Sequence, residues 1–260
     1  MMRIVSSRIF DLLSQAGDIA LKYYLKGGYS IVNKSTVDIV TQADRDIDLF
    51  FHKRLAKLYP EMDILTEETA PENYSSLKDK EFVWIIDPLD GTINFSRNYL
   101  SFCISIGLVN FGKPIFGAVY APLTKDMFWA SDDKQRSYRN RELLKVSTVS
   151  RLTEVILGTD WSHKLPERKK TVKYLDVLSQ KVRRINITGN ILNILSVAEG
   201  TTDGYFHGSL KPWDKAAAVI IITKAGGKVT GLNGEEQSIF SPGILATNNI
   251  IHSKLLKLMK

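Results

Sequence analysis

The sequence has a single cysteine, Cys103, so no disulfide can form within the chain. It also lacks any run of 18 apolar residues, and charged residues interrupt its first 26 positions. These absences exclude a scaffold held by disulfides, and they predict neither a membrane span nor a secretory leader. Cys103 lies in an apolar segment, which favours a small buried side chain over a catalytic thiol. We therefore expect a cytoplasmic protein.

Internal repeats, low-complexity segments and linkers rich in Pro, Gly or Ser are also lacking. What is present is an ordinary globular composition, with 44% hydrophobic residues, 24% charged residues and a net charge of +7. A basic balance can indicate nucleic acid, a membrane surface or a small anion as the partner. The lysines and arginines are scattered, and neither zinc-finger spacing nor an aromatic RNA-binding motif occurs. We expect a small phosphorylated substrate as the partner, with no membrane and no nucleic acid.

The apolar pattern predicts helices and strands in alternation along the chain. Helical spacing covers residues 4–26 and 41–58, and a buried helix is expected at 216–222. Further helices are predicted at 166–180, 189–199 and 251–260, and strands at 82–86, 101–109, 114–120, 126–130, 228–231 and 243–247. This mixture indicates a layered α and β protein.

The segment 87–92, Asp-Pro-Leu-Asp-Gly-Thr, follows the first predicted strand. Asp87 and Asp90 have no basic residue between them, and such close like charges are costly unless a cation neutralises them. Mg²⁺ is a hard cation that prefers carboxylate and phosphate oxygens. Gly91 and Thr92 supply backbone N–H groups at an expected helix start, which attracts phosphate. A plain strand-ending turn is the alternative, because Asp, Pro and Gly are common turn residues.

Three other acidic positions are candidates to complete a metal site. Glu67 and Glu68 follow a short apolar stretch, Asp214 precedes the Ala-rich helix, and Asp44 lies near the start of the second helix. Each has a simpler interpretation: solvated glutamates, an N-cap at Asp214, and a cap or solvated carboxylate at Asp44. The cap and metal roles are compatible at Asp214, since one carboxylate can fill both.

Four motifs in order along the chain resemble those of the inositol monophosphatase family, which belongs to a superfamily of lithium-sensitive, Mg²⁺-dependent phosphatases. They are residues 40–44 (Val-Thr-Gln-Ala-Asp), 66–68 (Thr-Glu-Glu), 84–95 around the hexapeptide, and 212–218 (Pro-Trp-Asp-Lys-Ala-Ala-Ala). The resemblance implies a mixed α and β fold, a five-layer αβαβα sandwich, often as a homodimer. We expect residues 1–260 to form one such domain, built of two closely packed α/β halves with a boundary near 145–155.

The resemblance also implies a role for each site residue. The implied ligands of two or three Mg²⁺ ions are Glu67, Asp87, the carbonyl of Leu89, Asp90 and Asp214. The implied catalytic residues are Asp44, Glu67 and Thr92, of which Asp44 and Thr92 would orient the attacking water, while Gly91 and Thr92 would hold the phosphate. Paired metal ions make hydroxide available near neutral pH, so no side-chain nucleophile is needed.

The expected substrate contacts are Asp90, Gly189, Asn190, His207 and Asp214. Residues 187–190, Ile-Thr-Gly-Asn, depart from a segment of small residues that touches substrate in the family. His207 stands where many members have a glutamate that contacts the inositol hydroxyls, although an ordinary turn histidine is the simpler interpretation. These departures leave the metal site intact and leave the specificity for inositol phosphate open.

The expected function is Mg²⁺-dependent hydrolysis of a small phosphate monoester, either inositol monophosphate or a related sugar or alcohol phosphate. Other substrates of the superfamily are histidinol phosphate, fructose 1,6-bisphosphate, NADP and 3′-phosphoadenosine 5′-phosphate. An alternative of another class is a catalytically weak regulatory protein that binds nucleic acid through its basic surface, with a steep dependence on salt. The presence of every expected metal ligand argues against that alternative.

Overall fold

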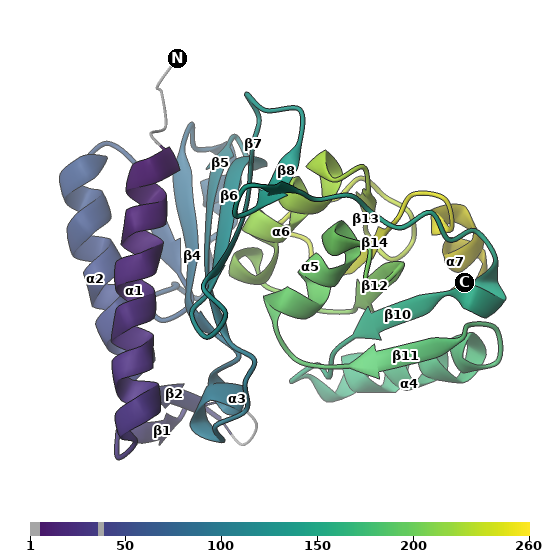
Figure 1. Cartoon of the computed structure of the whole chain (residues 1–260), viewed down its shortest axis with the longest axis horizontal. Coiled ribbons are helices and arrows are strands. Elements are labelled where there is room, and N and C mark those ends of the chain that lie inside the picture. Colours follow the sequence, from purple (N-terminus) through teal and green to yellow (C-terminus); the bar gives the residue numbers. More distant parts are fainter. Residues whose placement is uncertain (1–5, 36–38) are drawn as a thin grey trace.

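The structure, a computed structural model, describes residues 6–35 and 39–260. The described residues form three β-sheets, of seven, five and two strands. Figure 1 shows the two larger sheets alternating with three layers of helices in the order αβαβα. The five-layer sandwich expected from the sequence is therefore confirmed. The helix predicted over 4–26 begins at Ser6 in the structure, and residues 4 and 5 lie outside the described residues.

The first layer consists of α1 (Ser6–Lys26) and α2 (Gln42–Leu58), which lie side by side on one face of the larger sheet. Their apolar positions recur at helical spacing, and Leu13, Ile47 and Phe51 are fully buried against the sheet. Both helices were expected from the sequence, and the structure confirms them. They could be predicted because the apolar stripe of each is long and regular.

The larger sheet, formed by described residues, has seven strands in the order β3-β4-β5-β6-β7-β8-β9. Only the β3–β4 pair is parallel. In β4, Trp84 and Ile86 face the α1–α2 layer, whereas Val83 and Ile85 face the middle helices. This burial on both faces explains the continuous apolar run. The strands are β3 (Asp63–Thr66), β4 (Val83–Asp90), β5 (Cys103–Asn110), β6 (Lys113–Ala121), β7 (Asp126–Ser131), β8 (Ser137–Arg139) and β9 (Glu142–Leu143).

The middle layer contains α5 (Ile191–Glu199) and α6 (Pro212–Lys224). α6 packs closely on β6 because Gly117 has no side chain; a Cβ there would lie 2.6 Å from the Ala217 Cα. The helix begins at Pro212, earlier than predicted, and its N-cap is Lys211. The alternative interpretation of Asp214 as the N-cap residue is therefore wrong in position, because proline at the first position starts the helix before the Ala-rich run. Asp214 is the third residue of the helix, and its carboxylate accepts a hydrogen bond from the backbone N–H of the N-cap residue.

The smaller sheet has five strands in the described chain, in the order β11-β10-β12-β14-β13. Its outer face is covered by α4 (Leu165–Ser179) and α7 (His252–Leu258), which bury Leu178 and Leu255 against Leu157 and Phe206. The strands are β10 (Ile156–Thr159), β11 (Arg184–Ile187), β12 (Gly204–His207), β13 (Lys228–Thr230) and β14 (Ile244–Thr247).

Several short elements are absent from the sequence prediction. The unpredicted elements are β1 (Ile31–Asn33), β2 (Ile39–Thr41), β3, β8 to β12 and the 3₁₀ turns Ser75–Asp79 and Leu152–Glu154. All have five residues or fewer, which is too short for a hydrophobic period to emerge. The helix start expected at Thr92 is confirmed by the short helix α3 (Thr92–Ser96). β12 corrects one interpretation directly: His207 is a buried strand residue, 3% exposed, and not a turn histidine.

Candidate active site

The segment 87–92 lies where β4 ends and α3 begins. Asp87 was expected after the strand but lies within it, since β4 continues to Asp90 with a shift of register against β5 between these two residues. Asp87 is 2% exposed, and its Oδ1 accepts a hydrogen bond of 3.1 Å from the Leu89 N–H. Gly91 then turns the chain with φ +86°, and a Cβ there would lie 2.9 Å from the Ser101 carbonyl oxygen. Only glycine fits this turn without strain.

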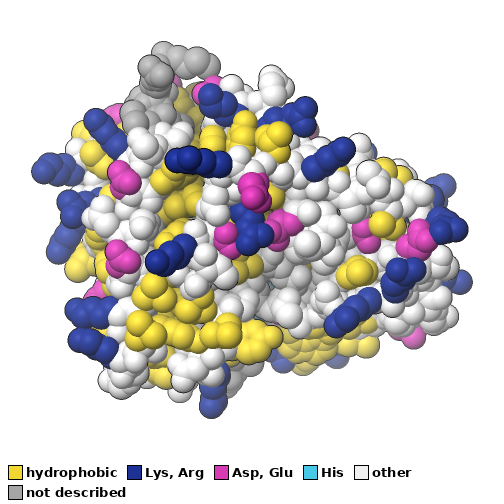
Figure 2. All heavy atoms as spheres, in the orientation of Figure 1, with side chains coloured by type: hydrophobic (Ala, Val, Ile, Leu, Met, Phe, Trp, Pro, Cys, Tyr) yellow, Lys and Arg dark blue, Asp and Glu magenta, His cyan; other side chains and the backbone are white. Residues whose placement is uncertain are grey.

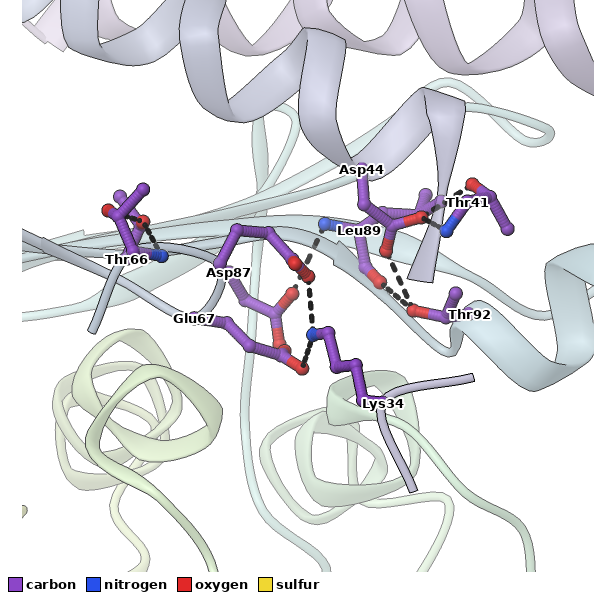
Figure 3. A network of polar contacts seen from close by, with 10 residues as sticks. Lys34, Thr41, Asp44, Thr66, Glu67, Asp87, Leu89 and Thr92 are labelled. Atoms are coloured by element: carbon purple, nitrogen blue, oxygen red, sulfur yellow. Dashed lines mark hydrogen bonds and ion pairs between the residues drawn. The ribbon is translucent and has the colours of Figure 1, made fainter. Parts of the chain in front are cut away.

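Asp44 and Thr92 are joined by a hydrogen bond between two distant elements (Figure 3). The Thr92 hydroxyl lies 2.9 Å from Asp44 Oδ1 and 3.0 Å from the Leu89 carbonyl oxygen, and these two acceptors share its single proton. Asp44 Oδ2 accepts hydrogen bonds from the Thr41 N–H at 2.9 Å and from the Thr41 hydroxyl at 2.5 Å. Burial raises the pKa of Asp44, and the hydrogen bonds from Thr41 and Thr92 act against that rise. The Thr92 oxygen keeps lone pairs that can accept a hydrogen bond.

Glu67 is brought beside Asp87 by the parallel pairing of β3 with β4, in which Thr66 faces Ile86. The Glu67 N–H donates to the Ile86 carbonyl oxygen at 3.2 Å, which fixes the carboxylate next to the end of β4. Glu67 and Glu68 are thus partly buried rather than fully solvated.

Lys34 reaches both glutamates from the segment that follows β1. Its Nζ lies 3.0 Å from Glu67 Oε1 and 2.7 Å from Glu68 Oε1. Burial alone would lower the pKa of Lys34, but the two carboxylates together raise it. Burial raises the pKa of Glu68 to about 7 although Lys34 opposes the rise. No local pattern in the sequence singles out Lys34, because the ion pairs join positions 33 and 34 residues apart.

Asp90 and Asp214 lie in the same cavity lining as Glu67 and Asp87, and we call these four residues the acidic wall. Asp90 Oδ2 accepts a hydrogen bond of 2.5 Å from the Ile191 N–H at the start of α5 and one of 3.2 Å from Cys103 Sγ. Asp214 Oδ2 accepts a hydrogen bond of 2.7 Å from the Lys211 N–H. Burial raises the pKa of Asp90 to about 7, and burial followed by repulsion from Glu67 and Asp90 raises that of Asp214.

The chemistry of these side chains fits a divalent cation. Asp87, Asp90 and Asp214 have no Lys, Arg or His nitrogen within 4.0 Å in the described residues. After burial, repulsion from Glu67, Asp90, Asp214 and Asp44 raises the pKa of Asp87 further. Within residues 6–35 and 39–260, no three His, Cys, Asp or Glu side chains already lie in a metal-ligating group. The fit rests on the chemistry of the donors, since carboxylate oxygens are the hard ligands that Mg²⁺ prefers.

The candidate substrate residues lie across the same cavity. The Gly189 carbonyl accepts a hydrogen bond of 3.1 Å from Asn94 Nδ2, which ties the α5 entrance to α3. Asn190 is the N-cap of α5, and its Nδ2 donates to the Ser101 hydroxyl at 2.6 Å. Burial lowers the pKa of His207 to about 4, and the Ser209 N–H lies 3.1 Å from its Nδ1. The ring is therefore neutral, with its proton on Nε2.

One cavity of about 460 Å³ collects these residues. Its lining includes Glu67, Asp87, Leu89, Asp90, Gly91, Thr92, Gly189, Asn190, His207 and Asp214. Every predicted site residue except Asp44 lines it, and Asp44 is hydrogen-bonded to Thr92, which does line it. The lining also contains residues that the sequence analysis missed, among them Asp160 and Arg168. Asp160 follows β10, and recognising that strand would have suggested an acidic residue at a strand end.

Two structural findings bear on the alternatives of membrane and nucleic acid. None of the helices in the described chain is both long and apolar enough to cross a membrane. Figure 2 shows lysine and arginine side chains distributed over one face, interspersed with acidic and apolar ones, rather than gathered in one stripe. This distribution does not favour a nucleic-acid-binding surface.

Comparison with known proteins gives consistent matches in sequence and in structure. The family model described as the inositol monophosphatase family matches residues 3–260. The chain is 35% identical to inositol-1-monophosphatase of Synechocystis sp., over 84% of this chain and 75% of that protein. It is 32% identical to a fructose-1,6-bisphosphatase/inositol-1-monophosphatase of Thermotoga maritima, over 95% and 93%. The crystal structure of the extragenic suppressor protein suhB from Bartonella henselae superposes with a TM-score of 0.90, at 29% identity and 99% coverage of both chains.

Fold, cavity and relatives together define an enzyme that hydrolyses phosphate monoesters. The chain belongs to the inositol monophosphatase family. Enzymes of this family use divalent metal ions, and the acidic wall described above offers the oxygen donors that such ions need.

Proposed function

We propose that this protein hydrolyses a small phosphate monoester in a Mg²⁺-dependent reaction, by attack of a water molecule on phosphorus. The observation that carries the proposal is the convergence of Glu67, Asp87, Asp90 and Asp214 on one cavity, with Thr92 beside them. These carboxylates repel one another in a buried site, and a divalent cation is the partner that relieves the repulsion.

The proposed ligands of the first ion are Glu67, Asp87 and the carbonyl oxygen of Leu89, and those of the second ion are Asp87, Asp90 and Asp214. A third, weaker ion would lie near Glu67, where Lys34 now contributes positive charge. When bound, the ions neutralise the phosphate charge and lower the pKa of a water that they hold. Lithium would inhibit the reaction and Ca²⁺ would do the same, as the family resemblance implies for lithium.

Asp44 and Thr92 are proposed to orient the attacking water. Because Thr92 donates its hydroxyl proton toward Asp44, its oxygen can accept a proton from a water on the cavity side. The Thr92 proton can then pass to Asp44 Oδ1, where burial favours the protonated carboxyl. Glu67, which lines the same cavity, is proposed as the third catalytic residue.

The phosphate is proposed to bind at the turn into α3. The N–H groups of Gly91 and Thr92 precede the first hydrogen bond of the helix, which runs 2.9 Å from the Phe95 N–H to the Gly91 carbonyl. Backbone N–H groups in this position are unpaired within a helix and favour a phosphate oxygen.

The alcohol part of the substrate is proposed to contact Asp90, Gly189, Asn190, His207 and Asp214. With its proton on Nε2, neutral His207 can donate to a hydroxyl oxygen but carries no charge. Inositol monophosphate is one candidate substrate. The others are histidinol phosphate, fructose 1,6-bisphosphate, NADP and 3′-phosphoadenosine 5′-phosphate.

The remaining proposals concern assembly and location. We propose one domain in two packed α/β halves that meet near residues 145–155, acting as a cytoplasmic homodimer. A homodimer is supported by apolar side chains at the α3 end of the molecule, where Figure 2 shows a broad apolar area. The exposed apolar residues include Leu25 near the end of α1, and Tyr99 and Leu100 shortly after α3; Leu100 is 77% exposed. Sedimentation of wild type and Leu100→Glu tests this: a dimer that the substitution converts to a monomer supports it, and a wild-type monomer contradicts it.

A phosphate-release screen tests the proposed activity. Purified protein is incubated with Mg²⁺ and a panel of inositol, sugar, histidinol and nucleotide phosphates. Release from at least one small monoester, abolished by EDTA, is the expected result. Release that is unchanged by EDTA contradicts the metal-dependent mechanism.

A further inference from the structure

We infer that a second wall of the catalytic cavity binds an additional phosphate group, so that the preferred substrates carry another phosphate besides the one that is hydrolysed. This inference rests on the proposed phosphatase function and narrows its substrate class. The wall is built from the loop between β10 and α4, the first turn of α4, and the loop that follows β12. We call it the basic wall; its members are Ser162, Lys164, Arg168, Ser209 and Lys211.

The positive charges of the basic wall are not neutralised by the protein. Lys164, Arg168 and Lys211 line the cavity, and none has a carboxylate oxygen within 4.0 Å in the described residues. One turn along α4 the situation differs, since Lys170 pairs with Glu167 at 3.0 Å. Three cations without a carboxylate partner in one cavity favour an anionic ligand.

Arg168 is held in an orientation that leaves its terminal nitrogens available. Its Nε donates to the Ser162 carbonyl oxygen at 2.5 Å, and its guanidinium carbon lies 5.8 Å from the centre of the Trp161 ring. Its two Nη groups donate no hydrogen bond to any described residue. A guanidinium fixed through Nε presents these two groups for bidentate binding of phosphate.

The two loops of the basic wall are fastened to each other. The hydroxyls of Ser162 and Ser209 lie 2.8 Å apart in a hydrogen bond, and the Lys164 N–H donates to the Ser162 hydroxyl at 3.1 Å. Lys211 extends from the second loop, with Nζ 5.8 Å from the centres of the Tyr74 and Trp213 rings. Contact with aromatic faces orients this ammonium without neutralising it. Arg168 and Lys211 are therefore oriented before a ligand binds, and the backbone of Lys164 is held beside them.

A second phosphate explains this wall better than an uncharged polyol does. The hydroxyls of a monophosphate need hydrogen-bond partners such as Asn190 and neutral His207, which the cavity already offers. They would leave Lys164 and Arg168 without a counter-charge. A phosphate at the far end of the substrate would accept hydrogen bonds from both, while the acidic wall binds the metal ions and the reacting phosphate.

The test compares fructose 1-phosphate with fructose 1,6-bisphosphate, which differ only in the second phosphate. We expect wild-type kcat/KM for the bisphosphate to exceed that for the monophosphate by about 10-fold or more. Arg168→Gln and Lys164→Gln should each lower the bisphosphate value by about 10- to 100-fold, mainly through KM. They should change the monophosphate value less than about 2-fold. The matched control is Lys169→Gln, an exposed residue outside the cavity, which should change neither.

Two results would overturn the inference. In one, wild type hydrolyses both compounds with equal kcat/KM; in the other, Arg168→Gln and Lys164→Gln lower both values alike. Either leaves the phosphatase proposal standing. Failure to release phosphate from any compound of the wider screen would instead contradict the phosphatase proposal, and the substrate inference with it.

Discussion

Thr92 Oγ1 lies 2.9 Å from Asp44 Oδ1, so a hydroxyl at the start of α3 is bound to a carboxylate in the first turn of α2. The two residues are separated by 48 positions in the chain. Asp44 is itself fixed by Thr41, so the position of the Thr92 hydroxyl is determined by another part of the fold. This relationship converts two ordinary helix-start residues into a candidate pair for moving a proton.

Removing either member of this pair should lower kcat much more than it changes KM. We expect Thr92→Val and Asp44→Asn each to reduce kcat by about 10²- to 10⁴-fold, the usual contribution of general acid–base catalysis. Thr92→Ser keeps the hydroxyl and should keep most of the activity. Steady-state phosphate release measures kcat and KM of each variant, and circular dichroism spectra that match wild type show that the variant is folded. Loss of activity in Thr92→Ser equal to that in Thr92→Val would contradict a role for the hydroxyl.

Lys34 should compete with metal binding at Glu67. Its ammonium lies 3.0 Å from the Glu67 carboxylate, so a cation that binds there must displace or repel it. We expect Lys34→Gln to lower the Mg²⁺ concentration for half-maximal activity by about 2- to 5-fold, the range of a partly exposed ion pair. The control Lys80→Gln breaks an ion pair with Asp63 outside the cavity lining. It should leave the Mg²⁺ concentration for half-maximal activity unchanged. A higher Mg²⁺ requirement in Lys34→Gln would show that Lys34 assists the site.

His207 should govern the choice of alcohol. Its neutral ring can donate one hydrogen bond, whereas a glutamate can accept several from polyol hydroxyls. We expect His207→Glu to raise kcat/KM for inositol 1-phosphate relative to the other substrates by about 10-fold. His207→Gln, which is neutral, controls for the loss of the ring. An unchanged ranking of substrates in His207→Glu would remove His207 from the specificity residues.

His252 should make stability depend on pH. It is buried between Thr230 and Thr247, whose hydroxyls lie 3.0 Å and 2.9 Å from its ring nitrogens, and burial lowers its pKa to about 4. The unfolded chain therefore binds a proton below about pH 6.5 that the folded protein excludes, and stability falls as the pH drops from 6.5 toward 4.

Urea unfolding at pH 7.5 and pH 5 measures this effect. Wild type should lose about 1–2 kcal/mol more between these pH values than His252→Asn does. The control His163→Gln changes an exposed histidine. Its free energy of unfolding should fall between pH 7.5 and pH 5 by as much as that of wild type. An equal loss in wild type and His252→Asn would contradict the assignment.

Long regular elements could be predicted from the sequence, and short ones could not. α1, α2 and the apolar run of β4 each carry enough residues for a period or a continuous stretch to stand out. β11, Arg184–Ile187, has four residues of mixed polarity and is held mainly by pairing with β10. Such strands depend on their neighbours more than on their own propensity.

The site divides in the same way. The acidic residues lie in motifs with a recognisable pattern, and the structure gathers Glu67, Asp87, Asp90 and Asp214 around one cavity. Lys34 and Arg168 have no local pattern, because their importance comes from what the fold brings near them. The sequence pattern predicts the start of α6 at residue 216 because the Ala-rich run dominates it, whereas the helix begins at Pro212.

The most direct test of the central claim is the rate of phosphate release as a function of Mg²⁺ in wild type and Asp214→Asn. Metal-stripped wild type should be inactive, and Mg²⁺ should restore its activity and raise its melting temperature. Asp214→Asn should remain folded, since an asparagine oxygen can still accept the hydrogen bond from the Lys211 N–H. Its kcat should nevertheless fall by about 10²-fold or more at any Mg²⁺ concentration. Activity of metal-stripped wild type, or near-normal turnover by Asp214→Asn, would contradict the metal-dependent account.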